Sequence, residues 1–292
     1  MKFNIANICF ALPDSFLEPS LAHALHPFAV DEGAKTDFEM VFAEEVSPEG
    51  RYHELERFDF TEDEADCRFG IDDAGNYILH MIPHDERAHM TNFKISSDAT
   101  RVECDHTSKH LEASLRFGLW IAFNATAVRS KAVAIHSSVI VYRGQAVLML
   151  GESGTGKSTQ TRLWREHIEG AKLLNDDSPI VRGNEDRVAD CYGSAWSGKA
   201  PCYINAHVPI RAFVRLSQAP YNKLRKLSRL EAIGALLPSC PLAFSHDKQL
   251  FNAVCATVSA IIKHTEVYHL ECLPNEEAAR LVRDTLFGAE EQ

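Results

Sequence analysis

Short apolar runs and polar helical segments alternate through the second half of this chain. Val133–Tyr142 and Gln145–Leu150 are apolar runs of strand length, separated only by Arg143-Gly144. This spacing predicts a β-hairpin. The following segment, Ser158–Glu169, contains few strand-forming residues and is followed by Gly170, so it predicts a helix. Further predicted strands are Lys172–Leu174, which runs into Asn175-Asp176-Asp177, and Arg187–Tyr192, Ile210–Leu216 and Val267–Cys272.

Three later segments carry helix signals. Ser228 and Glu231 have capping-box spacing ahead of an apolar stretch. Asp247–His264 is a long apolar-rich segment. Asn275 can cap Glu276–Phe287, which begins with acidic residues and is followed by glycine. Helices between short strands predict an α/β fold with a mixed sheet.

The first part of the chain has a weaker pattern. Strands are predicted at Phe3–Leu12, Phe38–Ala43 and Asn76–Met81, between long polar loops. The apolar segment Leu111–Val128 approaches the length of a membrane span, but it contains Glu, Arg and Asn. We therefore expect a buried helix packed behind the domain that follows it. We predict a mixed α/β region of unknown role over 1–110 and a second domain over 111–292.

Composition narrows the function classes. The chain has 292 residues, 45% hydrophobic and 24% charged, as expected for a globular protein with a sizeable core. Thirty basic against 41 acidic residues give a net charge of −11, which argues against nucleic-acid and anionic-membrane partners. Eight dispersed cysteines without a C-x-x-C pair predict reduced, mostly buried thiols. The N-terminal segment lacks the pattern of a signal peptide, so we expect a cytoplasmic protein.

One eight-residue motif carries the main chemical signal. It matches G-x-x-x-x-G-K-[ST], the phosphate-binding loop, and comprises Gly151, Glu152, Ser153, Gly154, Thr155, Gly156, Lys157 and Ser158, with Thr159 following. In such loops backbone amides surround the phosphates, the lysine neutralises phosphate oxygens, and the serine can bind Mg²⁺. An incidental glycine-rich turn is the alternative. The apolar strand before the motif and the helix after it favour nucleotide binding.

A carboxylate pair follows the loop. Asp176 and Asp177 lie 19 and 20 residues after Lys157, at the end of a predicted strand. Phosphoryl transfer needs a metal site and a group that orients or deprotonates the acceptor. One carboxylate could serve the magnesium shell and the other could face the acceptor hydroxyl. The alternative is that Asn-Asp-Asp-Ser-Pro forms only an Asx-type turn.

Three other features leave alternatives open. His136 lies in an apolar strand, where spacing alone favours a structural core histidine. The Gly193–Lys199 segment is either an ordinary surface loop or a substrate loop in which Trp196 and Lys199 contact ring and phosphate. Arg211 and Arg215 lie in one predicted strand, and one of them could reach the transferred phosphate.

Three segments together resemble the HPr kinase/phosphorylase catalytic domain. They are the loop GESGTGKST that follows the predicted hairpin, the upstream AIHSSVIVYRGQAVLMLG and the downstream LNDDSPI. The resemblance covers roughly 130–288 and is stronger to HPr-kinase-like serine and peptide kinases. It implies the phosphoenolpyruvate-carboxykinase-like fold. It also implies that His136 acts near the transferred phosphate, that Asp176 belongs to the magnesium shell, and that Asp177 is the acid/base. The chain has His-Ser where HPr kinases have His-Gly and lacks their downstream glycine-rich signature, so HPr as substrate and the phosphorylase reaction are not expected.

The expected function is an ATP-dependent, Mg²⁺-requiring kinase with Lys157, Asp177 and His136 as catalytic residues. Its acceptor would be a serine-like hydroxyl of a small molecule or peptide. One alternative is a nucleotide-binding regulatory or assembly protein with little catalysis. Another is a carboxykinase-like enzyme acting on an oxo acid. The sequence does not distinguish ATP from another nucleotide or pyrophosphate, nor a monomer from a homo-oligomer.

Overall fold

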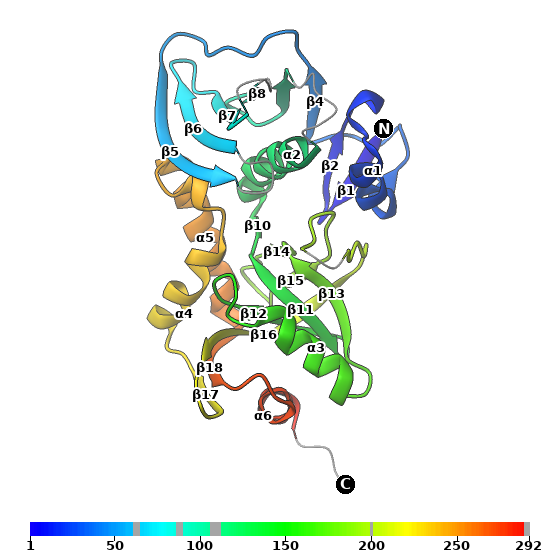
Figure 1. The fold of residues 1–292 in the computed structure, drawn as a ribbon, viewed down its shortest axis with the longest axis vertical. Helices are drawn as coiled ribbons and strands as arrows, with labels where there is room; N and C mark the ends of the chain where they lie inside the picture. Colours follow the sequence, from blue (N-terminus) through cyan, green and yellow to red (C-terminus); the bar gives the residue numbers. More distant parts are fainter. Residues whose placement is uncertain (61–64, 86–89, 106–111, 199–200, 289–292) are drawn as a thin grey trace. The chain divides into compact units, whose positions relative to one another are not determined.

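The computed structural model describes residues 1–60, 65–85, 90–105, 112–198 and 201–288. The chain forms two compact units (Figure 1). The first comprises Met1–Ser130 with Ala243–Phe251, and the second comprises Lys131–Leu242 with Asn252–Gln292. Across the described residues the protein is a mixed α/β protein with two nine-stranded mixed sheets. The predicted α/β class with mixed strand directions is confirmed, whereas the division into two sheets was not predicted.

The sheet of the first unit has the strand order β3-β1-β2-β4-β9-β8-β7-β6-β5. Its strands, in chain order, are β1 (Lys2–Ile5), β2 (Ile8–Ala11), β3 (Ala29–Val30), β4 (Phe38–Phe42), β5 (Tyr52–Phe60), β6 (Ala65–Asp72), β7 (Tyr77–Pro83), β8 (Thr91–Ile95) and β9 (Arg101–Cys104). The predicted strands in the Phe38 and Asn76 regions are confirmed. The prediction of one strand over Phe3–Leu12 is wrong, because Ala6 and Asn7 have φ of 52° and 61° and turn the chain into a hairpin.

Two α-helices of the first unit, α1 (Pro19–Leu25) and α2 (Glu112–Ala127), pack against each other, and α2 also lies on β8. A Cβ added at Gly118 of α2 would meet the Phe93 ring of β8 at 2.2 Å, so glycine lets the helix approach the sheet. The predicted buried helix is confirmed. The helix belongs to the first unit, whereas the sequence analysis placed it in the domain of the phosphate loop. The length of an apolar segment indicates that the helix is buried, but it does not indicate which sheet the helix packs on. No helix in the described part of the chain combines the length and apolarity of a membrane span.

The sheet of the second unit has the order β10-β14-β15-β16-β12-β11-β13, and β18 joins β16 and β17. Its strands are β10 (Ala132–Ala134), β11 (Ser137–Tyr142), β12 (Gln145–Leu150), β13 (Lys172–Asp177), β14 (Ile180–Arg182), β15 (Asp190–Tyr192), β16 (His207–Gln218), β17 (Lys223–Lys226) and β18 (Glu266–Cys272). The predicted hairpin is confirmed, with Arg143 and Gly144 at φ of 48° and 73° between β11 and β12.

The predicted strand Val133–Tyr142 is divided at Ile135-His136. The Ile135 amide donates to Pro179 O at 3.1 Å and the His136 amide to Ser239 O at 2.7 Å. The chain thereby changes partner, from β14 beside β10 to β12 and β13 beside β11. A continuous strand prediction is wrong here because these bonds are made to residues far along the chain, and the break leaves the His136 side chain 48% exposed.

The helices after the hairpin follow the sequence signals closely. They are α3 (Lys157–His167), α4 (Arg229–Leu236), α5 (Lys248–His264) and α6 (Glu276–Phe287). The Ser228–Glu231 capping box forms, and Asn275 accepts from the Ala278 amide at 3.1 Å. All eight cysteines are free and seven are buried, which agrees with the prediction of reduced thiols.

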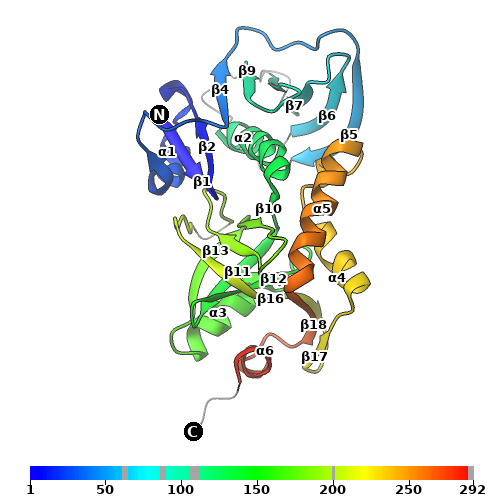
Figure 2. The ribbon, with the colours of Figure 1, turned by 180° about the vertical axis from the view of Figure 1, so that it is seen from behind.

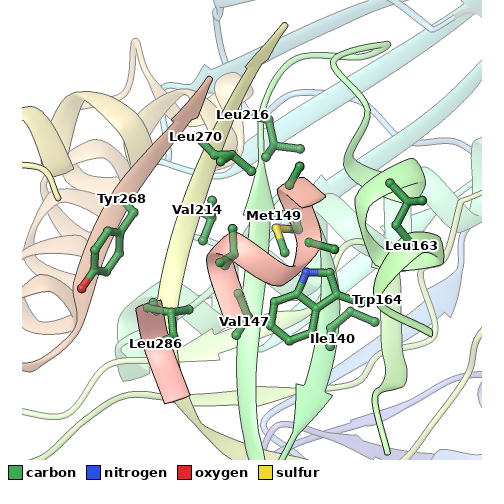
Figure 3. Close-up of a cluster of buried hydrophobic side chains, with 14 of the residues drawn as sticks. Ile140, Val147, Met149, Leu163, Trp164, Val214, Leu216, Tyr268, Leu270 and Leu286 are labelled. Carbon is green, nitrogen blue, oxygen red and sulfur yellow. The ribbon is translucent and has the colours of Figure 1, made fainter. Parts of the chain in front are cut away.

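Helices α3 and α6 bury a hydrophobic cluster against β11, β12, β16 and β18 (Figure 3). Alternate residues of these strands face the cluster, including Val147 and Met149 of β12 and Val214 of β16. Trp164 of α3 is 0% exposed and packs edge-to-face on Tyr142, with ring centroids 6.1 Å apart. This packing fixes α3, and with it the loop that precedes α3, on the sheet.

We expect Trp164→Ala to lower the free energy of unfolding by about 3–5 kcal/mol, because it removes a fully buried aromatic ring and leaves a cavity. The indole Nε1 has no hydrogen-bond partner among the described residues, so the loss is one of packing. Denaturant unfolding measures the effect. Leu230→Ala in α4 is the control, since Leu230 is 80% exposed and its truncation should change stability by less than about 0.5 kcal/mol.

Candidate functional site

The topology of the second sheet brings the predicted chemical residues to one edge. β12 is parallel to β16, and β11 is antiparallel to both β12 and β13. The ends of β12, β13 and β16 therefore meet the start of β11. The strand register shows the same arrangement, because Ser137 lies opposite both Leu150 and Asp177, and Leu150 lies opposite Arg215. The glycine-rich loop leaves β12 at this edge and leads into α3 (Figure 2).

The loop conformation depends on its glycines. Gly151, Gly154 and Gly156 have φ of 150°, 81° and 104°, in the region that L side chains rarely adopt. The Thr155 amide and hydroxyl both donate to Glu152 O, at 3.3 and 2.8 Å, which closes the turn. Glu152, Ser153 and Gly154 are exposed, whereas Thr155, Gly156, Lys157 and Thr159 are partly buried. No side chain caps α3, whose N-cap is Gly156, so its first-turn amides remain available to an anion.

We expect Gly151→Ala to disrupt this loop. A Cβ at this position would meet Thr155 Oγ1 at 2.4 Å, and the residue would also keep an unfavourable φ. The substitution should reduce nucleotide affinity about tenfold or more, equivalent to roughly 1–3 kcal/mol of backbone strain. Titration of a nucleotide measures the effect. Gly144→Ala is the control, because Gly144 has φ of 73° but open space around its Cβ position, so binding should be unchanged.

Lys157 bends back over the loop. Its Nζ donates to Gly151 O at 2.8 Å and to Glu152 O at 3.1 Å. Burial lowers the pKa of its ammonium group, while Asp177 and Asp176 act in the opposite direction. The side chain thus holds a cation beside the loop amides and close to two carboxylates. This combination suits phosphate oxygens.

Asp176 joins the loop helix to the strands through hydroxyl groups. Ser158 Oγ donates to Asp176 Oδ1 at 2.9 Å, and Ser138 Oγ donates to the same oxygen at 2.5 Å. The predicted metal pair, Ser158 and Asp176, is therefore in contact. Among the described residues, no cluster of three or more His, Cys, Asp or Glu side chains could hold a metal by itself. A serine–carboxylate pair fits Mg²⁺, which commonly takes one or two protein ligands together with phosphate oxygens and waters.

Asp177 and His136 form a second pair at the same edge. His136 Nε2 lies 3.6 Å from Asp177 Oδ1, and the two side chains are 48% and 43% exposed. Burial, followed by the charge of Lys157, lowers the pKa of His136 below 6.5. His136 is therefore a partly exposed residue beside the carboxylates, and the interpretation as a core histidine is wrong.

Asn175 carries the Asx turn that the sequence left as an alternative. Its Oδ1 accepts from the amides of Asp177 and Ser178 at 3.0 and 2.9 Å. Its Nδ2 donates to Ser194 Oγ at 3.2 Å and to Trp196 O at 3.1 Å. The Asn175 side chain therefore forms the turn that precedes Pro179. Asn175 is 0% exposed and the sequence motifs did not identify it as a positioning residue.

The described part of the Gly193–Lys199 segment, 193–198, lies against the carboxylate strand. Ser197 forms an isolated antiparallel bridge with Asp177, and the Gly198 amide donates to Asp176 O at 3.1 Å. The segment is therefore placed beside the site. Trp196 is buried, at 5% exposure, so it does not present an exposed ring to a ligand. Lys199 lies outside the described residues.

The two candidate arginines lie four residues apart within β16 and have different partners. Arg211 Nε donates to Leu286 O at 2.9 Å, and its guanidinium lies over the Phe287 ring. The Arg211 side chain therefore contacts the C-terminal end of α6. Arg215 pairs with Leu150 in the register, and its Nη2 lies 3.8 Å from Glu152 Oε1 of the loop. Arg215 is thus the member of the pair at the site.

No family model and no curated protein sequence matches the chain. A functional interpretation consequently depends on the residues at this edge. They combine a glycine-rich loop with three positive-φ glycines, a serine–carboxylate pair and a carboxylate–histidine pair within one continuous group of strands.

Proposed function

We propose that the protein is an ATP-dependent kinase of the HPr-kinase-like group, with a phosphoenolpyruvate-carboxykinase-like catalytic fold. The proposed acceptor is a serine-like hydroxyl of a small molecule or peptide. The observation that carries the proposal is the placement of Ser158–Asp176 and His136–Asp177 at the edge from which the phosphate loop emerges. The hairpin that feeds the loop supports the same fold group, because ordinary phosphate loops more often follow a parallel βαβ unit.

The phosphate-binding part of the mechanism uses the loop. Amides at the start of α3 and the Lys157 ammonium group would hold the nucleotide phosphates and stabilise charge that develops on them during transfer. Ser158 donates its proton to Asp176, which leaves its oxygen lone pairs for a metal. Mg²⁺ held by Ser158 and Asp176 would neutralise charge on the phosphate oxygens.

The transfer step uses Asp177. The acceptor oxygen forms a bond to the γ-phosphorus, the bond to the bridging oxygen breaks, and the nucleoside diphosphate leaves. The acceptor proton passes to Asp177, in the role that a carboxylate plays in other kinases. His136, 3.6 Å from Asp177, orients this carboxylate without competing for its charge while the imidazole is neutral.

We expect kcat/KM to depend on pH through the protonation of His136. Because its pKa in the folded protein is lowered below 6.5, the imidazole is neutral at pH 7 and becomes protonated only as the pH falls below 6.5. Protonation would pair His136 with Asp177 and weaken the carboxylate as a base, so kcat/KM should fall with pH in this range. The unfolded chain binds this proton more readily, so stability is also lost in the same range and none is lost above it.

The profile of kcat/KM against pH in wild type and His136→Asn measures this dependence. The variant should lose the part of the acid limb just below pH 6.5. The exposed His23→Asn substitution is the control and should leave the profile unchanged. An identical acid limb in His136→Asn and wild type would contradict the role assigned to His136.

The function itself is tested by transfer of labelled γ-phosphate from MgATP to a panel of acceptors, beginning with free serine and serine-containing peptides. We expect labelled product from at least one hydroxyl acceptor and none from its deoxy counterpart. Tight nucleotide binding without transfer to any acceptor, and without slow hydrolysis, would favour the regulatory alternative. Transfer that required an oxo acid would favour the carboxykinase alternative.

A further inference from the structure

A buried chain of hydroxyl groups lies behind Asp176 and outside the residues assigned to the reaction. Ser138 of β11 and Thr161 of α3 are each 1% exposed. Ser138 Oγ lies 2.8 Å from Thr161 Oγ1 and 2.5 Å from Asp176 Oδ1. These hydroxyl groups link β11, the helix after the loop (α3) and the carboxylate strand (β13).

The single proton of each hydroxyl fixes the direction of these bonds. Ser138 donates its proton to the carboxylate, because an ionised carboxylate only accepts. Thr161 must then be the donor in its 2.8 Å bond to Ser138, which is shorter than the other contact of its hydroxyl, 3.2 Å to Ser158 O. The order of donation is Thr161 to Ser138 to Asp176, with Ser158 donating to Asp176 from the other side.

Both donors reach the same carboxylate oxygen. Among the described residues, the hydrogen bonds to the Asp176 side chain go to Oδ1. The rotation of the carboxylate is therefore fixed, and Oδ2 is the oxygen left for the metal shell. A hydroxyl at 2.5 Å from a carboxylate oxygen has the length expected for a charge-assisted bond.

We propose that Ser138, supported by Thr161, is a positioning residue for the divalent metal: it orients Asp176 so that Asp176 and Ser158 bind Mg²⁺ together with the nucleotide phosphates. This inference rests on the proposed function. Ser138 acts through Asp176, since its burial excludes contact with nucleotide or acceptor. Loss of a residue that hydrogen-bonds to a metal ligand typically weakens metal affinity about 10–100-fold.

The chain provides a matched control next to Ser138. Ser137 is also buried, at 0% exposure, and its Oγ donates to Ile135 O at 2.9 Å. Successive residues of a strand point to opposite faces, so Ser137 shares the residue type, burial and strand of Ser138 but not its partner. A general effect of removing a buried hydroxyl should appear in both Ser137→Ala and Ser138→Ala. An effect on the metal should appear in Ser138→Ala alone.

The test measures Mn²⁺ binding by electron paramagnetic resonance, with the full-length protein saturated with a non-hydrolysable ATP analogue. We expect Ser138→Ala to weaken Mn²⁺ binding about tenfold or more, Thr161→Val to weaken it by less, and Ser137→Ala to leave it unchanged. Ser138→Thr, which keeps a hydroxyl, should restore most of the affinity. Thr161→Val keeps the volume of the side chain. It tests the hydrogen-bonded hydroxyl groups independently if Ser138→Ala does not fold.

The outcomes separate this inference from the proposed function. Wild-type Mn²⁺ affinity in Ser138→Ala and Thr161→Val, with Lys157-dependent nucleotide binding intact, would overturn the role of Ser138 and leave the kinase proposal standing. Equal weakening in Ser137→Ala and Ser138→Ala would also overturn it, as a general structural effect. Absence of Mn²⁺ binding in the wild-type nucleotide complex would overturn both the inference and the metal site on which it rests.

Discussion

Asp177→Asn is expected to slow phosphoryl transfer by orders of magnitude and to leave nucleotide binding nearly intact. The amide cannot take the acceptor proton, and a general base contributes about 10²–10⁴-fold to such reactions. The substitution preserves the size of the side chain. The backbone turn should also persist, because it is formed by Asn175 and by the Asp177 amide. Turnover should fall by this factor, whereas the dissociation constant for MgATP should change by less than about threefold, since the proposed role of Asp177 is proton transfer and not phosphate binding.

Single-turnover transfer and equilibrium titration of the same preparation separate these two quantities. Asp186→Asn is the control, because Asp186 is an exposed carboxylate elsewhere in the same unit and its loss should change neither quantity. Turnover close to the wild-type value in Asp177→Asn would show that another group takes the proton. The regulatory alternative makes a different prediction, since it requires no consequence from this substitution.

Lys157→Ala is expected to weaken nucleotide binding strongly, the second large effect. The ammonium group is the cation that the loop holds at the proposed phosphate position, through bonds to Gly151 O and Glu152 O. A charge-assisted hydrogen bond contributes about 1.5–3 kcal/mol, so affinity should fall at least roughly tenfold and by up to about 100-fold. The effect should be at the upper end, because Asp176 and Asp177 would then repel the phosphates without a nearby lysine.

The exposed Lys172 provides the matched control for charge. It lies at the start of β13, at the opposite end of that strand from the carboxylates. Lys172→Ala changes the net charge by the same amount and should leave affinity within about twofold. Equal losses in the two variants would mean that nucleotide binding depends on net charge and not on the loop.

The parts of the fold and site predicted from sequence are those set by local chemistry. The hairpin turn, the loop glycines and the capping box each depend on residues within a few positions of one another. Their residue types restrict φ or supply a specific cap, so the sequence pattern is sufficient. The same reasoning placed Asp176 and Asp177 at the end of a strand next to the loop.

The parts that were missed depend on partners distant in sequence. The break at His136 follows from a bond to Ser239 O, 103 positions away in the sequence, and nothing in the local run signals it. Ser138 and Thr161 resemble ordinary strand and helix residues until β11, α3 and β13 are brought together. Asn175 was visible only as part of a turn, because its bonds to the Ser194–Trp196 segment need the folded sheet. In each case the residue type is common, and the function proposed for it comes from geometry.

The most direct test of the central claim is a calorimetric titration of wild type and Lys157→Ala with MgATP, MgGTP and Mg-pyrophosphate. We predict that wild type binds MgATP, that affinity falls at least tenfold in Lys157→Ala as argued above, and that pyrophosphate binds more weakly than ATP. Binding of another donor in preference to ATP would keep the phosphate site and change the donor. Absence of binding for all three in wild type, or equal binding in wild type and Lys157→Ala, would contradict the assignment of this loop as a nucleotide-binding site.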